Sequence, residues 1–199
     1  MTETELRNRA MTIIDRMVPK QGKSESGNPL YSALWNKYVA PANGTSCGRL
    51  PQYLIQELLS AFGLKAPNTG RWIGNGGVDI EYLLTGMIDH RPDAFVKPGA
   101  GLPKPGDLYH IQGGGANHIG IVISADHSSW ITADSGAEIK GQKPAAQRRQ
   151  RQYLGGALSG ESQQGVRMVP LKGWADIGKY FRAEAGDSLL TTLIRLYGN

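Results

Sequence analysis

The chain has 199 residues, of which 40% are hydrophobic and 20% charged, so it is long enough to bury one well-formed core. Lysine and arginine number 22 against 17 aspartate and glutamate residues, a surplus that favours an anionic partner such as a bacterial cell wall. We expect no nucleic-acid partner, because no nucleic-acid-binding motif accompanies the charge, and no membrane insertion, because no run of about 18 apolar residues occurs. A single cysteine excludes an intramolecular disulfide and every zinc site that needs two thiolates.

The N-terminal segment "MTETELRNRAMTIIDRMVPK" predicts an amphipathic helix within an N-terminal extension of about residues 1–25. Thr2 and Glu5 have the spacing of a capping box. The segment lacks the basic-then-apolar order of a secretory signal, so we expect the chain to be made in the cytoplasm without one. The apolar residues at helical spacing are Leu6, Ala10, Ile13, Ile14 and Met17.

Four further helices are predicted, over 30–40, after Cys47, over 78–90 and over 186–197. In the helix after Cys47, leucines recur every fourth residue, a proline falls in the first turn and Gly63 is suited to end the helix. The leucines are Leu50, Leu54 and Leu58.

From Pro103 onward, short β-like runs alternate with turn signals. The runs are "KPGDLYHIQ", "NHIGIVIS", "SSWITADSG", "RQYLGGALS" and "GVRMVPLKGW". Arg148, Arg149 and Arg151 form a basic cluster that we assign to a solvated loop before the fourth run. Helices first and an antiparallel sheet second predict a single α+β domain over residues 1–199.

Cys47 stands where the polar segment "NGTSCG" gives way to a helix. The partial positive charge of a helix N-terminus lowers the pKa of a cysteine and thereby promotes the nucleophilic thiolate. The alternative is a buried structural cysteine, which more often lies on the apolar face inside an element. The loop position favours a reactive thiol.

A catalytic cysteine needs a base, and the chain has four histidines. His118 is the strongest candidate, because it opens a strand-like run after the glycine-rich "QGGGAN". His110 lies within a predicted strand and is the main rival. His127 falls in a polar hairpin loop, and His90 ends a predicted helix.

The register of the predicted hairpin selects a carboxylate for His118. A three-residue loop over 125–127 pairs Ser124 with Ser128 and sets His118 opposite Asp134. Directly opposed side chains have Cβ atoms roughly 4.5–5.5 Å apart. Asp134 is therefore placed to orient the imidazole and to stabilise its charged form.

These motifs resemble those of the NlpC and CHAP cysteine peptidases, papain-like bacterial enzymes that cut peptide or amide bonds in peptidoglycan. The similarity rests on a cysteine at a helix start, then "PGD" entering a strand, then "HIGIV", then a polar residue on the next strand. The aspartate in "WITADSG" and the later "GW-x-D" over 173–176 resemble a subset that includes cell-wall-degrading effectors of type VI secretion. The resemblance covers about residues 40–180.

The resemblance implies a papain-like α+β fold with N-terminal helices packed on a central antiparallel sheet. It makes Cys47 the nucleophile, His118 the general base and then acid, and Asp134 the orienting group. Neither a metal nor a cofactor is expected. A side chain near the nucleophile is expected to complete the oxyanion hole beside the Cys47 N–H, and two aromatic residues are expected to line the substrate groove. The oxyanion candidates are Tyr38, Asn43 and Thr45, and the groove residues are Trp72 and Tyr109.

The implied function is cleavage of peptidoglycan stem peptides by an antibacterial effector delivered to the periplasm of a target bacterium. Such an effector has a cognate immunity protein and a component of the secretion apparatus as partners. Two alternatives stay open: a protease or acyltransferase acting on a protein, and a non-catalytic cell-wall-binding module. A metallohydrolase built on three histidines and an aspartate ranks last, because no HExxH-like spacing supports it. Its candidate ligands are His110, His118, His127 and either Asp107 or Asp126.

Overall fold

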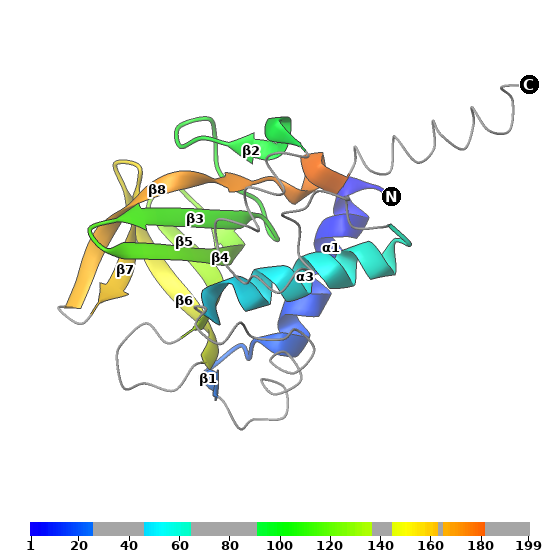
Figure 1. Cartoon of the computed structure of the whole chain (residues 1–199), viewed down its shortest axis with the longest axis horizontal. Coiled ribbons are helices and arrows are strands. Elements are labelled where there is room, and N and C mark those ends of the chain that lie inside the picture. The colour runs from blue at the N-terminus through cyan, green and yellow to red at the C-terminus, as the bar shows by residue number, and fades with distance from the viewer. Residues whose placement is uncertain (26–45, 65–90, 137–144, 163–164, 182–199) are drawn as a thin grey trace, which may run out of the picture.

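The computed structural model describes residues 1–25, 46–64, 91–136, 145–162 and 165–181, in which two helices pack against a strongly curved antiparallel sheet (Figure 1). The predicted helices over 30–40, 78–90 and 186–197 lie outside these residues. None of the described helices combines the length and apolar character needed to cross a membrane. The elements are α1 (Glu3–Met17), β1 (Lys23–Glu25), the 3-10 turn η1 (Ser46–Gly48), α3 (Arg49–Ala61), η2 (Pro92–Ala94), β2 (Phe95–Val96), β3 (Leu108–Gly113), β4 (Ala116–Ala125), β5 (Ser129–Gly136), β6 (Ala145–Leu154), β7 (Ala157–Ser162) and β8 (Gly165–Ala175).

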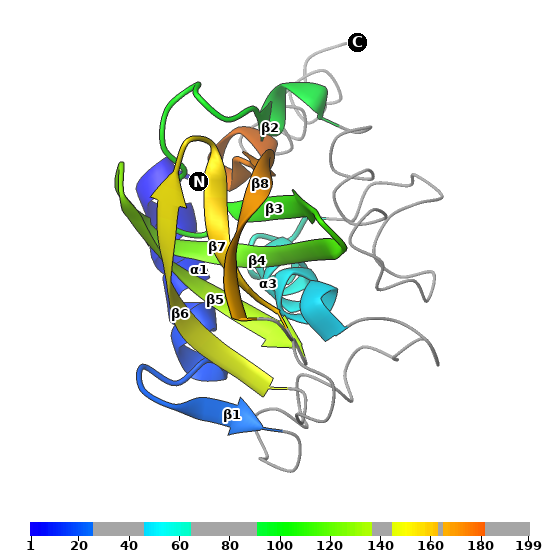
Figure 2. The ribbon, with the colours of Figure 1, turned by 90° about the vertical axis from the view of Figure 1, so that its left-hand side faces the viewer.

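Six strands close into a barrel. Strands β3 to β8 pair with their neighbours in chain order, and β8 pairs back with β3, so the ring has no free edge. Strand β1 extends the sheet beside β6, and β2 extends it beside β8. Figure 2 shows β6, β7 and β8 on the side of the barrel that faces away from α3.

The predicted papain-like α+β fold, with helices packed on an open central sheet, is therefore wrong. The decisive segment is "RQYLGGALS", which does not form one strand but a hairpin between β6 and β7, turning at Gly155 and Gly156. Both glycines have positive φ, at 58° and 79°, as a tight two-residue hairpin requires. Because β7 pairs with β6 on one side and with β8 on the other, it closes the barrel.

The barrel interior forms one of two hydrophobic cores. Strand alternation directs every second side chain inward, where two tryptophans pack edge to face, with ring centroids 6.2 Å apart. The buried residues of this core are Tyr109, Ile111, Val122, Trp130, Leu158, Val169, Leu171 and Trp174.

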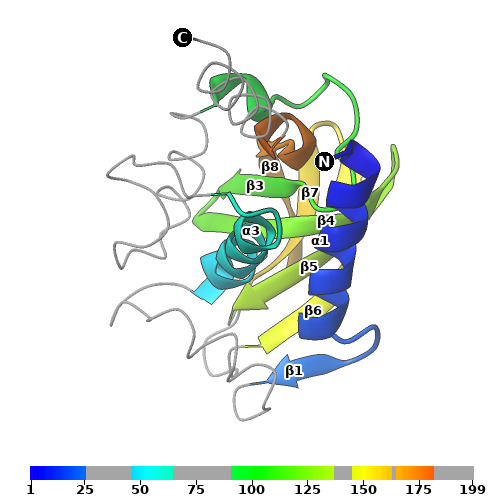
Figure 3. The same ribbon diagram turned by 90° about the vertical axis from the view of Figure 1, so that its right-hand side faces the viewer.

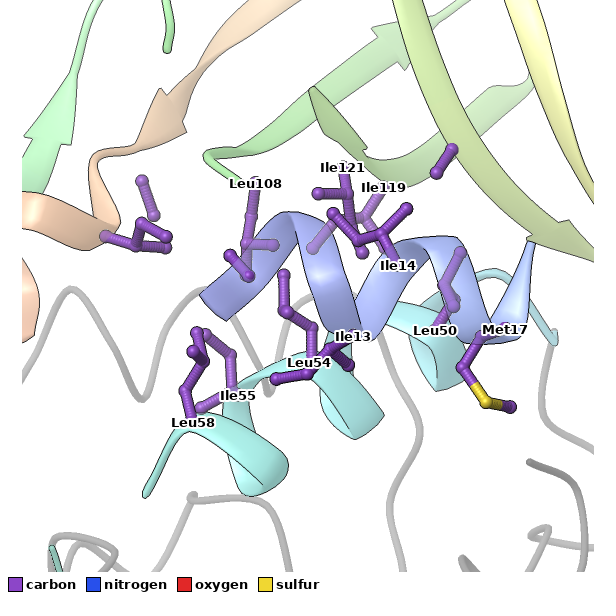
Figure 4. Packing of buried hydrophobic residues seen from close by; sticks show 14 of the residues in the cluster. Ile13, Ile14, Met17, Leu50, Leu54, Ile55, Leu58, Leu108, Ile119 and Ile121 are labelled. Carbon is purple, nitrogen blue, oxygen red and sulfur yellow. The ribbon is translucent and has the colours of Figure 1, made fainter. Parts of the chain in front are cut away.

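The second core lies between the outer face of the barrel and the two helices, as Figure 3 shows from the helix side. The helix predicted over the N-terminal segment is confirmed, with its capping box formed by Thr2 and Glu5 and its five apolar residues buried. The helix after Cys47 is confirmed as well, and its three leucines are buried. In Figure 4, Ile13 and Leu54 of the two helices lie beside each other beneath the sheet residues Ile119 and Ile121.

Polar contacts fix α1 to one end of the barrel. The Arg7 guanidinium donates to Asp107 at 2.9 Å and to Asp176 at 3.0 Å, joining α1 to residues at the start of β3 and the end of β8. The sequence pattern had marked both aspartates, in "PGD" and "GW-x-D". Burial raises the pKa of the Asp107 carboxyl to about 6, although the charge of Arg7 opposes this shift. These aspartates therefore join α1 to the barrel.

Candidate active site

Cys47 lies in η1, directly before α3, as the sequence predicts. The turn η1 lies against both β4 and β5, and the Cys47 residue is only 5% exposed. Its side chain is hydrogen-bonded to His118 of β4. The thiol is thus both buried and paired with a base.

His118 and Asp134 are in direct contact. The His118 Nε2 atom lies 2.7 Å from Asp134 Oδ1. Because this bond occupies Nε2, the ring nitrogen left for the Cys47 sulfur is Nδ1. The His118 side chain is 13% exposed and that of Asp134 is 2% exposed, so the imidazole lies between the interior and the surface.

The predicted hairpin register is wrong, although the contact that it predicted is formed. Ser124 pairs with Ile131 instead of Ser128, and a bulge follows before Val122. Beyond the bulge Ile121 pairs with Ala133, which places Gly120, and not His118, opposite Asp134. His118 is then two residues along the same face, within reach of a diagonal contact.

Gly120 makes this diagonal contact possible. A Cβ atom at position 120 would lie 2.3 Å from Asp134 Oδ1 and 2.6 Å from Cε1 of Tyr109. Real Cβ atoms do not approach other atoms so closely, so the glycine of "HIGIV" provides the space in which the carboxylate and the phenol meet.

The Asp134 carboxylate has four partners, two at each oxygen. Oδ1 accepts from His118 and, at 2.5 Å, from the Tyr109 hydroxyl. Oδ2 accepts from the Thr132 hydroxyl at 2.6 Å and forms an ion pair with Arg151 Nη2 at 3.2 Å. The carboxylate is therefore fully satisfied although it is buried.

The charges of the site are mutually stabilised. Burial alone would raise the pKa of the Asp134 carboxyl, but Arg151 and the hydrogen bonds from His118 and Thr132 hold it well below its usual range. Burial alone would lower the pKa of His118, but hydrogen bonds to Asp134 and Cys47, with their negative charges, raise it to about 9. The imidazole is consequently protonated at neutral pH.

Ser135 anchors the nucleophile from the opposite face of β5. Its hydroxyl donates to the Cys47 carbonyl at 3.3 Å and accepts from the Leu50 N–H at 3.3 Å. Neighbouring strand residues point to opposite faces, so Asp134 faces the barrel interior and the histidine while Ser135 faces η1. The serine acts on α3 as an N-cap supplied by another element, because Gly48 has no side chain to cap the helix.

The remaining predicted site residues have other positions. Tyr109 is fully buried inside the barrel, so the prediction that it lines a substrate groove is wrong; its hydroxyl serves Asp134 instead. The rival base His110 contacts Asn117 at 2.8 Å through Nε2. His127 is exposed in the hairpin turn. The residues Tyr38, Asn43, Thr45, Trp72 and His90 lie outside the described parts of the chain.

The metallohydrolase alternative finds no ligand set within the described residues. Asp107 is bound to Arg7, and Asp126 accepts hydrogen bonds from Ser128 and Ser129 within its own hairpin. In this part of the chain no three His, Cys, Asp or Glu side chains come together as a metal site would require.

The prediction that the three arginines lie in a solvated loop is wrong. Because of it, Arg151 was not recognised as a residue of the site. All three arginines lie in β6, and Arg151 is 3% exposed, with its side chain inside the barrel. Thr132 and Ser135 were missed as well. The available signal was the Gly-Gly turn after Leu154, which marks the preceding residues as one arm of a hairpin.

Comparison with models of protein families, with curated proteins and with solved structures yields no match to this chain.

Proposed function

We propose that this protein is a cysteine hydrolase that cleaves amide bonds in the stem peptides of peptidoglycan. The observation that carries the proposal is the chain of contacts from the Cys47 side chain to His118 and from His118 Nε2 to Asp134 at 2.7 Å. These contacts link a nucleophile to a base and the base to an orienting carboxylate.

In the proposed reaction the Cys47 thiolate attacks the carbonyl carbon of the scissile amide. The tetrahedral intermediate collapses to a thioester when the C–N bond breaks, and protonated His118 gives its proton to the leaving amine. Neutral His118 then takes a proton from water while the resulting hydroxide attacks the thioester. The C–S bond breaks, the acid and the Cys47 thiolate are released, and His118 keeps the proton, which restores the starting ion pair. Asp134 keeps the imidazole oriented in each step and remains ionised.

The start of α3 supports this chemistry at the oxyanion. Cys47 and Gly48 occupy the turn that leads into α3, so their backbone amides stand at the N-terminal end of the helix. Amides of this kind, with the positive end of the helix dipole behind them, are suited to bind the negative oxygen of a tetrahedral intermediate.

The choice of peptidoglycan rests on the motif "HIGIV" with its upstream cysteine and downstream aspartate, and on the basic charge of the chain. On this proposal the protein is an antibacterial effector delivered to the periplasm of a target cell, and a cognate immunity protein protects the producer by covering Cys47. The resemblance of motifs supports the substrate class. The proposal does not require a papain-like fold, and these residues lie on a closed barrel.

Digestion of purified peptidoglycan tests the proposal. Wild type and Cys47→Ala are incubated with the same sacculi, and soluble fragments are identified by mass spectrometry. We expect new fragments from the wild type alone, with a free amine and a free carboxyl at the cut, and their masses identify the bond.

Two other outcomes direct the search elsewhere. If neither protein releases fragments but Cys47 reacts rapidly with iodoacetamide, the wall substrate is wrong and protein substrates or acyl transfer replace it. If Cys47 is also inert toward iodoacetamide while the protein sediments with insoluble peptidoglycan, the protein is a wall-binding module and the catalytic proposal fails.

A further inference from the structure

Arg151 is buried inside the barrel, and its guanidinium pairs with Asp134 Oδ2, whereas His118 contacts Oδ1 of the same carboxylate. We propose that Arg151 is a positioning residue that acts on the nucleophile through Asp134, keeping that carboxylate charged and aimed at His118. This inference rests on the proposed function only in assuming that Cys47 acts as a nucleophile, and its test needs no substrate.

The Arg151 guanidinium is held by contacts on several sides. Nη2 pairs with Asp134 Oδ2 at 3.2 Å, Nε donates to the Thr132 hydroxyl at 3.1 Å, and Nη1 donates to the Ser159 carbonyl at 2.6 Å. The group also lies over the Tyr109 ring, 5.6 Å from its centroid. Three strands therefore fix the position of one cation.

Thr132 transmits this position to the carboxylate. Its hydroxyl donates to Asp134 Oδ2 at 2.6 Å while it accepts from Arg151 Nε. With Oδ2 occupied from the arginine side, the carboxylate turns its other oxygen toward His118 and Tyr109. The orientation of the acceptor for His118 is thus set from inside the barrel.

The charge of Arg151 matters because the surroundings are apolar. Asp134, His118 and a Cys47 thiolate carry two negative charges and one positive charge, and the buried guanidinium balances them to zero. An uncompensated buried charge is strongly unfavourable, so without Arg151 the Asp134 carboxylate tends to take up a proton. A protonated Asp134 no longer stabilises the His118 imidazolium, and the Cys47 thiolate loses its partner charge.

The groups that face Asp134 are identified for each neighbouring strand. They are His118 on β4, Tyr109 on β3, Arg151 on β6 and, through His118, Cys47 of η1; Thr132 on its own strand does not titrate. Removal of the Arg151 charge is therefore expected to appear in the pH dependence of the thiol and not only in stability.

The test is the rate of Cys47 alkylation by iodoacetamide between pH 4 and pH 10, measured on wild type, Arg151→Gln and Arg151→Lys. Loss of a neighbouring opposite charge should move the midpoint of the alkylation profile in Arg151→Gln upward by about one to three pH units. Arg151→Lys retains the charge, so its alkylation midpoint should lie close to that of wild type. Arg148→Gln is the matched control, because Arg148 lies on the same strand but contacts Asp15 of α1, and its profile should follow wild type.

A double-variant comparison covers the case in which Arg151→Gln does not fold. Asp134→Asn and Asp134→Asn/Arg151→Gln are compared; the second removes both charges and leaves no unpaired ion. If Arg151 acts through Asp134, the two profiles coincide.

Three results would overturn the inference: an Arg151→Gln profile that matches wild type, an Arg151→Lys profile shifted as far as that of Arg151→Gln, or a further shift in the double variant. A failure of wall digestion with the predicted alkylation shifts intact refutes the substrate and leaves the positioning role standing.

Discussion

Among single residues of the site, Gly120 is the one with the least space for a side chain. The space for its missing side chain is filled by the Asp134 carboxylate and the Tyr109 ring, both of which are buried. Neither group is the free end of a flexible surface chain, so a methyl group at this position cannot be accommodated by a small local shift.

Gly120→Ala should displace Asp134 from His118. We expect the free energy of unfolding to fall by about 1–3 kcal/mol, as for other overpacked cores, and Cys47 alkylation at pH 7 to slow at least several-fold. Urea unfolding and the iodoacetamide rate measure the two effects. Gly160→Ala is the control: its added Cβ would lie 3.1 Å from the Val169 side chain and 3.8 Å from that of Ile111, neither of which belongs to the site, so the alkylation rate should be unchanged. Wild-type alkylation in Gly120→Ala would refute the close-approach argument.

Ser135→Ala should loosen the nucleophile without touching the base. The variant loses one hydroxyl that bridges the Cys47 carbonyl and the Leu50 N–H, so we expect a loss of about 1 kcal/mol in unfolding free energy, as for other helix caps. Hydrolysis and alkylation should both slow, with the pH midpoint of alkylation unchanged. Ser129 is on the same strand, and its hydroxyl accepts from the exposed Gln150 side chain, so Ser129→Ala should behave as wild type. An equal effect in both variants would count against the anchor.

At the scale of elements, α1 is attached to the barrel by an ionic cluster that is partly buried. Hydrogen bonds from Lys104 and Arg7 lower the pKa of Glu3 to about 2, whereas burial raises that of Asp107 to about 6. The two carboxylates therefore respond to pH in opposite directions.

Asp107 should make the protein less stable as the pH rises from 4 to 6. The folded-state pKa is above the unfolded value of 3.8, so the folded state binds the proton more tightly and this stabilisation is lost as pH passes through about 6. The shift corresponds to about 3 kcal/mol. Urea unfolding of wild type and Asp107→Asn over this range should give a stability difference that declines with pH; a flat or rising difference would contradict the expected burial effect.

Elements with local signals were predictable and elements defined by pairing were not. Helix α1 follows from its capping box and apolar spacing, and α3 from its leucines and Gly63. Most of strand β6 was missed because six of its residues are glutamines and arginines in an unbroken polar run, a composition typical of loops. What makes that run a strand is its partners: β5, β7 and, through Arg151, a carboxylate distant in sequence.

The candidate site divides in the same way. The cysteine at a helix start and its pairing with His118 and Asp134 were accessible from residue types and hairpin alternation, even though the assumed register was wrong. A slip by an even number of residues retains the face of the sheet, which is why the contact survived. Arg151 was missed because it lies in a run of polar residues, and Ser135 was missed because its contacts depend on the packing of η1.

For the whole molecule, the shifted groups predict a stability maximum in mild acid. Asp134 and Glu3, with lowered pKa values, lose their contribution as pH falls below their unfolded values of 3.8 and 4.5. Asp107 loses its contribution through about pH 6, and His118, raised from 6.5, loses its own through about 9. We expect the unfolding free energy to be largest between about pH 4 and 5 and to decline toward pH 9.

Urea titrations at closely spaced pH values measure this curve. His118→Gln is the informative variant, because it should remove the decline between pH 6.5 and 9 while leaving the decline between 4 and 6. A wild-type curve that rises from pH 6.5 to 9 would show that the imidazolium is not stabilised by Asp134 and Cys47.

Closure of the barrel also has a kinetic consequence. Strands β3 to β6 follow one another as hairpins, so His118, Asp134 and Arg151 can be brought together by local pairing. The seam between β3 and β8, in contrast, joins Ile111 to Leu171 and must bridge the intervening chain. Pairing over so long a loop carries a larger entropic barrier and slows folding. During refolding, native pairing along this seam should therefore be completed after the pairings that bring His118, Asp134 and Arg151 together have formed.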